Sequence, residues 1–279
     1  MSDRKVTAQY ARWIWAACLI VLSTSCLFAA DQSLAEKAWN ILDTGLHDDK
    51  KIDNRIQAVL ALGVIPNNKK ALDAAEQALD DPNGDVSRAA ITALADMDAR
   101  SSLPKIKALI DRADAKTVVT IAAALNQFKD PEAYDLYYEL LTGKRKDGGS
   151  VLDGLRDKKG LEKMGAQTVI GFLPLGGIAN GTYGYLKQNG AGRANLDLTA
   201  INALQQDPDP RVEKALIDAS FEGKQSVQVA ALRALAKRGD PMPIDSIESL
   251  IYSDKADVRY TAAATIVHLV NAQPRQRPS

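Results

Sequence analysis

Apolar and small residues recur along this chain with a period of about 31 residues, which is typical of repeat architectures. Within two blocks an apolar anchor returns once per period, and the gap between the two blocks equals one period plus an insertion. In such architectures each unit buries its apolar face against the next. The six anchors are Leu62, Leu94, Leu125, Leu204, Leu235 and Ile266.

The residues around each anchor predict an α-helix. Apolar residues or alanines stand at positions i, i+4, i+5, i+7 and i+8, as in Val227, Ala231, Leu232, Ala234 and Leu235. This spacing places them on one helical face. The alanines allow neighbouring helices to approach closely. We therefore expect Ala231 to lie in a contact between helices and Ala236 to lie outside it.

A second helix follows each anchor helix after a short break, often at an Asp-Pro pair. Asp accepts hydrogen bonds from the free amides of a first helical turn, and Pro fits the first helical position. The pattern predicts an all-α fold, an α-α superhelix of about six helix pairs interrupted by one insertion. Helices at 35–46 and 257–270 are expected to cap its two ends. The second helices are predicted at 67–79, 103–111, 131–141, 210–221 and 243–252.

Residues 81–94 (DPNGDVSRAAITAL) and 257–264 (DVRYTAAA) resemble HEAT repeats, most closely the short bacterial type that also occurs in phycobilisome lyases. The resemblance covers residues 53–142 and 195–270. It implies a curved scaffold for protein partners rather than an enzyme, with the second helices on the concave side. It also implies a polar ladder between successive repeats, formed by Asp85, Arg88, Asp257 and Arg259.

The first thirty residues have the pattern of an export signal. Arg4, Lys5 and Arg12 precede eighteen uncharged residues, 13–30, which end in small residues before Asp31. Cleavage after Ala30 is predicted. Eighteen residues is also the lower limit for spanning a bilayer, so an uncleaved anchor is the alternative. Lipid attachment at Cys26 is disfavoured, since Ser23 stands where bacterial lipoproteins carry an aliphatic residue. Export makes the protein periplasmic or secreted.

Composition adds little sign of catalysis. Lys and Arg (35) balance Asp and Glu (35), which removes the usual electrostatic basis for nucleic-acid binding. Both cysteines, Cys18 and Cys26, lie within the signal, and the two histidines, His47 and His268, are far apart in sequence. The chain contains no phosphate-binding loop, no nucleophile elbow and no zinc-protease motif. We expect no enzyme activity, no cofactor and no metal.

Three tyrosines in the predicted helix 131–141 are candidates for a partner contact. Tyr134 shares a helical face with Tyr137 and Tyr138, because their spacing is three and four residues. Tyrosine is favoured at protein interfaces, since its ring is large and its hydroxyl stays hydrated. Burial of at least one ring in the core is the alternative.

Residues 143–195 interrupt the repeat. Residues 164–186 carry no charge, and Pro174, Gly176 and Gly177 break their middle, which favours a hairpin of two half-helices over a spanning helix. Such a segment needs an apolar cover, from the solenoid itself, a partner or lipid. We expect it to dock a partner or a membrane and the flanking repeats to stack on each other. Its candidate contact residues are Phe172, Leu173, Leu175, Tyr183 and Tyr185.

The sequence thus divides into five parts. They are the signal (1–30), N-terminal repeats (31–142), the insertion (143–195), C-terminal repeats (196–271) and a tail (272–279). The predicted function is a non-catalytic scaffold for protein–protein interaction outside the cytoplasm. A membrane-associated module docking through residues 164–186 is the alternative, and a lyase-like enzyme or enzyme accessory is a remote one.

Overall fold

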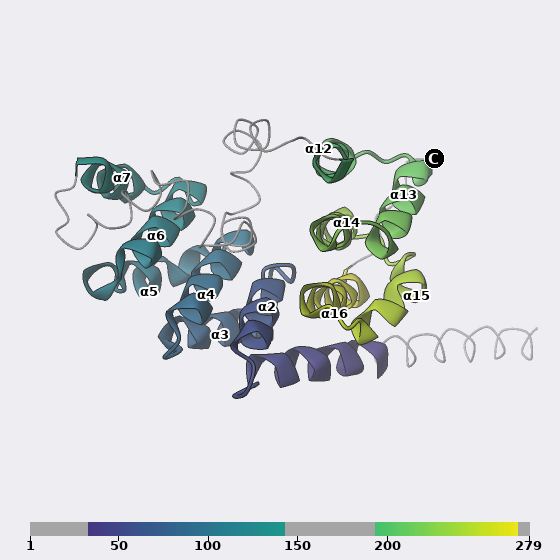
Figure 1. Ribbon diagram of the computed structural model, residues 1–279, viewed down its shortest axis with the longest axis horizontal. Coiled ribbons are helices and arrows are strands. Elements are labelled where there is room, and N and C mark those ends of the chain that lie inside the picture. The colour runs from purple at the N-terminus through teal and green to yellow at the C-terminus, as the bar shows by residue number, and fades with distance from the viewer. Residues whose placement is uncertain (1–32, 143–192, 273–279) are drawn as a thin grey trace, which may run out of the picture.

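The computed structural model describes residues 33–142 and 193–272, and within them the chain forms helices and no strand (Figure 1). The predicted all-α solenoid is confirmed. The expected signal, most of the insertion and nearly all of the tail lie outside the described residues. Besides a first helix at 33–46, the α-helices are α2 (Ile52–Leu62), α3 (Lys69–Gln77), α4 (Gly84–Asp96), α5 (Leu103–Lys107), α6 (Ala115–Gln127), α7 (Glu132–Thr142), α12 (Arg193–Leu204), α13 (Pro210–Phe221), α14 (Gln225–Arg238), α15 (Ile244–Ile247) and α16 (Ala256–Asn271).

The helices form two layers along an arc. On the inner side, successive contacts run from α12 to α14, α16, α2, α4 and α6. Figure 1 shows α13, α15, the helix at 33–46, α3 and α5 along the outer side. With α7 beside α6, the described residues make six helix pairs. The second helices therefore line the outer side, and the expectation that they line the concave side is wrong.

The order of the helices in space differs from their order in sequence. Helix α16, the last described helix, packs directly against α2, the first inner helix in sequence. The two blocks of repeats thus join through the ends of the described chain, and α7 and α12 stand at opposite ends of the array (Figure 1). The insertion links these two ends, so the repeats on either side of it do not stack on each other as the sequence suggested.

The helix at 33–46 completes the unit that α16 begins. Its residues Leu34, Ala38 and Leu42 are buried in the common core. Gly45 lies so close to α16 that a Cβ there would stand 2.4 Å from a ring carbon of Tyr260. These helices meet in the middle of the array, and the expectation that they cap its two ends is wrong.

Asparagine and aspartate begin several of the helices. The side chains of Asn68, Asn83, Asp114 and Asp209 each accept a hydrogen bond from a first-turn amide. Pro210 then occupies the first position of α13, as its Asp-Pro pair predicts. At Asp81-Pro82, by contrast, α4 begins only after Asn83, which leaves the Asp81 carboxylate available for another contact.

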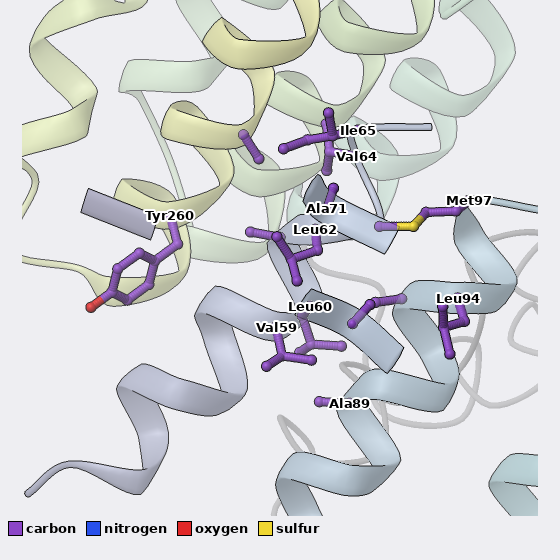
Figure 2. Packing of buried hydrophobic residues seen from close by; sticks show 14 of the residues in the cluster. Val59, Leu60, Leu62, Val64, Ile65, Ala71, Ala89, Leu94, Met97 and Tyr260 are labelled. Carbon is purple, nitrogen blue, oxygen red and sulfur yellow. The ribbon is translucent and has the colours of Figure 1, made fainter. Parts of the chain in front are cut away.

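The core is a continuous cluster of leucine, isoleucine, valine and alanine (Figure 2). The alanine positions of the repeat, among them Ala90, Ala93, Ala231 and Ala262, are fully or almost fully buried between inner helices. Ala236, which was expected to lie outside the contact between helices, is buried as well. The inner helices between the two ends of the layer have neighbours on both sides as well as an outer helix, and little of their surface stays free.

Candidate functional site

The three tyrosines lie on the outward face of α7, which we call the tyrosine face. Ala133, Leu136 and Leu140 alternate with them and are buried. This helical spacing leaves Tyr134, Tyr137 and Tyr138 72%, 41% and 47% exposed, respectively. None of the three is a core residue.

The tyrosine face is ordered by its own contacts. The rings of Tyr134 and Tyr138 stack with centroids 6.3 Å apart and an interplanar angle of 16°. Partial burial raises the pKa of the Tyr137 hydroxyl, which is protonated at neutral pH even without this shift. Three large rings that keep hydroxyls near water suit the surface for a protein contact.

An ion-pair cluster fixes the start of α7 against α5. The Nζ atom of Lys107 lies 2.8 Å from Asp130 Oδ2 and 3.0 Å from Glu132 Oε2. The hydrogen bond with Lys107 lowers the pKa of the Asp130 carboxyl. Because α7 is tied in this way to a helix of the outer layer, the tyrosine face lies at the end of that layer and not on the concave side.

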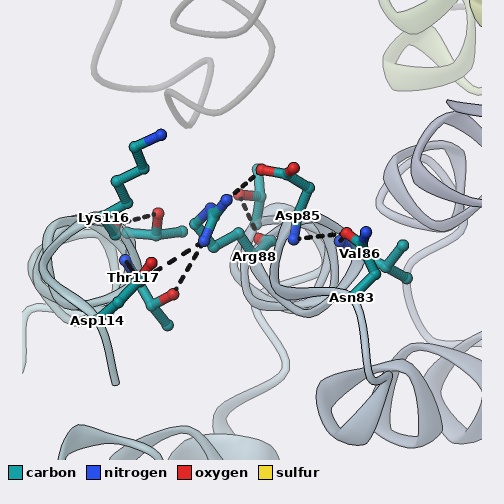
Figure 3. Close-up of polar contacts among 9 residues, drawn as sticks. Asn83, Asp85, Val86, Arg88, Asp114, Lys116 and Thr117 are labelled. Carbon is teal, nitrogen blue, oxygen red and sulfur yellow. Dashed lines mark hydrogen bonds and ion pairs between the residues drawn. The ribbon is translucent and has the colours of Figure 1, made fainter. Parts of the chain in front are cut away.

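Polar rungs connect consecutive inner helices (Figure 3). Arg88 of α4 donates a 3.2 Å hydrogen bond to Thr117 Oγ1 of α6 and also pairs with Asp114 (3.6 Å) and with Asp85 of its own helix. Arg88 therefore lies between two repeats, and Asp85 orients it.

A second rung was not anticipated from the sequence. Arg55 of α2 donates a 3.2 Å hydrogen bond to Asp81 Oδ1, just before α4. Arg55 and Asp81 stand as far apart in sequence as Arg88 and Asp114 do, so the repeat spacing could have revealed it.

The C-terminal block has a different arrangement. Asp257 accepts a 3.0 Å hydrogen bond from Gln225, which joins α16 to α14. Arg259 donates to the backbone oxygen of Ser253 (2.6 Å) and lies over the ring of Tyr260. Both contacts lie beside the start of its own helix, whereas the resemblance implied that Arg259 lies between two repeats.

One polar contact crosses between the two blocks. Nη1 of Arg233, on α14, lies 2.8 Å from Asp96 Oδ2 at the end of α4, and Nη2 lies 3.3 Å from the backbone oxygen of Leu60 on α2. In the inner layer α16 and α2 separate α14 from α4. The Arg233 side chain can therefore reach Asp96 only because the ends of the inner helices converge. Such convergence places this contact on the inside of a strongly curved array.

A groove of about 480 Å³ lies between the outer helices α3 and α5. Ion pairs cross it, from Lys105 to Glu76 and from Arg112 to Asp80. Ser102 also donates to Glu76 (2.6 Å). Since these charges satisfy one another, the groove is best explained as a joint between repeats.

The described residues offer neither a metal site nor a membrane-spanning helix. No group of three or more His, Cys, Asp or Glu side chains is placed to hold a metal ion in the described part of the chain. None of the helices at 33–142 and 193–272 is both long and apolar enough to cross a membrane. The insertion candidates Phe172, Leu173, Leu175, Tyr183 and Tyr185 lie outside the described residues.

The family comparison agrees with this geometry. A family model for HEAT repeats matches residues 42–126 and, in an overlapping copy, 72–147. Over these residues the chain is similar to HEAT repeats. Such repeats generally act as scaffolds for protein–protein interaction and are typically non-catalytic. No curated protein is significantly similar to the chain in sequence.

Proposed function

We propose that this chain is a non-catalytic protein-interaction scaffold that works outside the cytoplasm and contacts its partner through the tyrosine face. The exposed, stacked pair of Tyr134 and Tyr138 carries the proposal. Aromatic residues at ordered surface positions are enriched at interfaces because they offer a large contact area at a small cost in conformational entropy.

The rigid support beneath the rings also favours the tyrosine face as a contact surface. Leu136 and Leu140 fix α7 in the core, and Lys107 fixes its first turn. A partner that covers the tyrosine face would therefore meet rings that are already positioned, and little conformational entropy would be lost on binding.

A capture experiment tests the tyrosine face. The double variant Tyr134→Ala/Tyr138→Ala is compared with the wild type in pull-downs from envelope extract, read by mass spectrometry. Tyr252→Ala is the matched control, because Tyr252 is 67% exposed but lies in the other block. We expect the double variant alone to lose captured proteins, with an unchanged melting temperature. Equal capture by all three proteins, or a loss of capture explained by lower stability, would contradict the proposal.

The extracytoplasmic location rests on the sequence of residues 1–30. Protein isolated from the envelope should begin at or near Asp31. An intact N-terminus on membrane-embedded protein would instead support the anchor, and a lipid on Cys26 would contradict both. Docking on a membrane through residues 164–186 stays a prediction from the sequence.

A further inference from the structure

Helix α12 ends the inner layer with an apolar face that no described helix covers. Its sequence repeats the contact pattern of the interior helices, yet Leu196 is 66% exposed and Leu204 is 41% exposed. Ala200 and Ala203, on the same helical face, are exposed as well. We call these four residues the α12 end face. The equivalent positions Val86, Ala90, Ala93 and Leu94 on α4, and Val227, Ala231, Ala234 and Leu235 on α14, are all buried.

The opposite side of α12 behaves like any other inner helix. Ile201 is buried, and α12 packs against α14. Interior helices are apolar on two sides because they have two neighbours in the layer. The α12 end face therefore has the composition of a surface that receives a further helix-sized apolar element, whereas end units of a solenoid normally present a polar outer face.

We infer that residues 164–186 of the same chain cover the α12 end face and close this end of the array. This segment is the longest uncharged stretch within 33–279. Gly177, Gly181 and Gly184 within it would allow the close approach that Ala200 and Ala203 permit from the other side.

Chain length allows this contact. Only residues 187–192 separate the uncharged stretch from α12, and six residues reach about 20 Å, while packed helix axes lie about 8–10 Å apart. From α7, residues 143–163 reach about 70 Å. So short a tether gives the segment a high effective concentration at α12, which favours it over a second copy of the chain.

Thiol labelling of the full chain tests the inference. With Cys18→Ser and Cys26→Ser as background, Ala200→Cys reports on the α12 end face. Ala215→Cys is the matched control, since Ala215 is an exposed alanine of the neighbouring helix α13. We expect maleimide to modify Cys at position 200 about tenfold or more slowly than Cys at position 215, because a covered thiol reacts only when the cover opens. Adding Leu173→Asp and Leu175→Asp should remove the difference.

The other outcomes overturn the inference. Equal labelling rates at the two positions would show that the α12 end face is open. Protection that grows with protein concentration would assign the cover to a second copy, and protection that appears only with phospholipid vesicles would assign it to lipid. Protection that survives Leu173→Asp/Leu175→Asp, in a chain of unchanged helical content, would assign it to another segment.

Discussion

Arg233 and Asp96 form an ion pair with Nη1 and Oδ2 2.8 Å apart, although 137 residues separate them in sequence. Both side chains are largely buried. Burial raises the pKa of the Asp96 carboxyl, and the guanidinium of Arg233 acts against that shift. The pair ties the C-terminal block to the N-terminal block on the inner side of the arc, where α16 and α2 also pack.

Removing Arg233 should destabilise the whole array. In Arg233→Ala the Asp96 carboxylate loses its partner and the backbone oxygen of Leu60 loses a donor. We expect a loss of about 3 kcal/mol in the free energy of unfolding, as for other broken buried pairs. Urea unfolding measures it. Arg211→Ala, which breaks an exposed pair with Asp209, should leave the midpoint unchanged. Equal midpoints for the wild type and Arg233→Ala would contradict the role of the pair.

The contact of Gly45 with Tyr260 predicts a second coupling between the ends of the chain. In Gly45→Ala the new Cβ would press on the buried ring of Tyr260 and on Ala58, so we expect about 1–3 kcal/mol of destabilisation. Gly84→Ala is the control, because only the end of the Arg88 side chain is near. In a Tyr260→Ala background, Gly45→Ala should cost much less. Strictly additive effects in this double-mutant cycle would show that the two residues do not touch.

Acid should weaken the interface between α14 and α16 through His268. Burial lowers the pKa of His268 below 6.5, while a hydrogen bond to the backbone of Ala236 partly opposes the shift. Below pH 6.5 the unfolded chain therefore binds more protons than the folded one, and stability falls as the pH drops through the folded pKa. We expect His268→Gln to reduce the fall in the free energy of unfolding between pH 7 and 5. His47→Gln, at an exposed site, should keep the pH dependence of the wild type. The same slope in both variants would contradict this.

The local structure of this protein could be predicted from its sequence, because it depends on short-range patterns. Helical spacing placed the inner helices, and the Asp209-Pro210 pair marked the start of the outer helix α13. The spatial order of the two blocks could not be predicted. Each inner helix has the same apolar and alanine pattern, so α16 can stack as well on α2 as α12 could on α6, and only particular shapes such as Gly45 against Tyr260 distinguish the two.

The candidate site was predictable to a similar extent. Helical spacing grouped Tyr134 with Tyr137 and Tyr138, but their exposure depends on α7 having no further neighbour in the described structure. The partner of Arg233 could not be found in the sequence, because it comes from the other block. Arg55 and Asp81 could have been found, since their spacing repeats that of Arg88 and Asp114.

The insertion should set the oligomeric state through its length. Deleting residues 148–192 and adding a three-residue linker leaves eight residues between α7 and α12, which span at most about 28 Å. Five helix-to-helix steps separate α6 from α12 in the inner layer, and α7 and α12 stand at opposite ends of the array (Figure 1).

We therefore expect the short-linker protein to close its array between two chains and form a dimer, visible by light scattering. A linker of about 30 residues in the same deletion should restore the monomer, since it reaches about 100 Å. A helical monomer with the short linker would mean that α7 and α12 are neighbours and that the arrangement of the blocks is wrong.

Distances between spin labels test the order of the helices most directly. Two cysteine pairs are introduced at exposed positions of the full chain, with Cys18→Ser and Cys26→Ser, and measured by double electron–electron resonance. Asp53→Cys with Asp254→Cys labels the starts of α2 and α16, and Asp135→Cys with Asn202→Cys labels α7 and α12. Because packed helices lie about 8–10 Å apart, the first pair should give distances of about 20 Å or less and the second pair clearly longer ones. A long first distance with a short second one would show that the repeats stack in sequence order and that the joining of the chain ends is wrong.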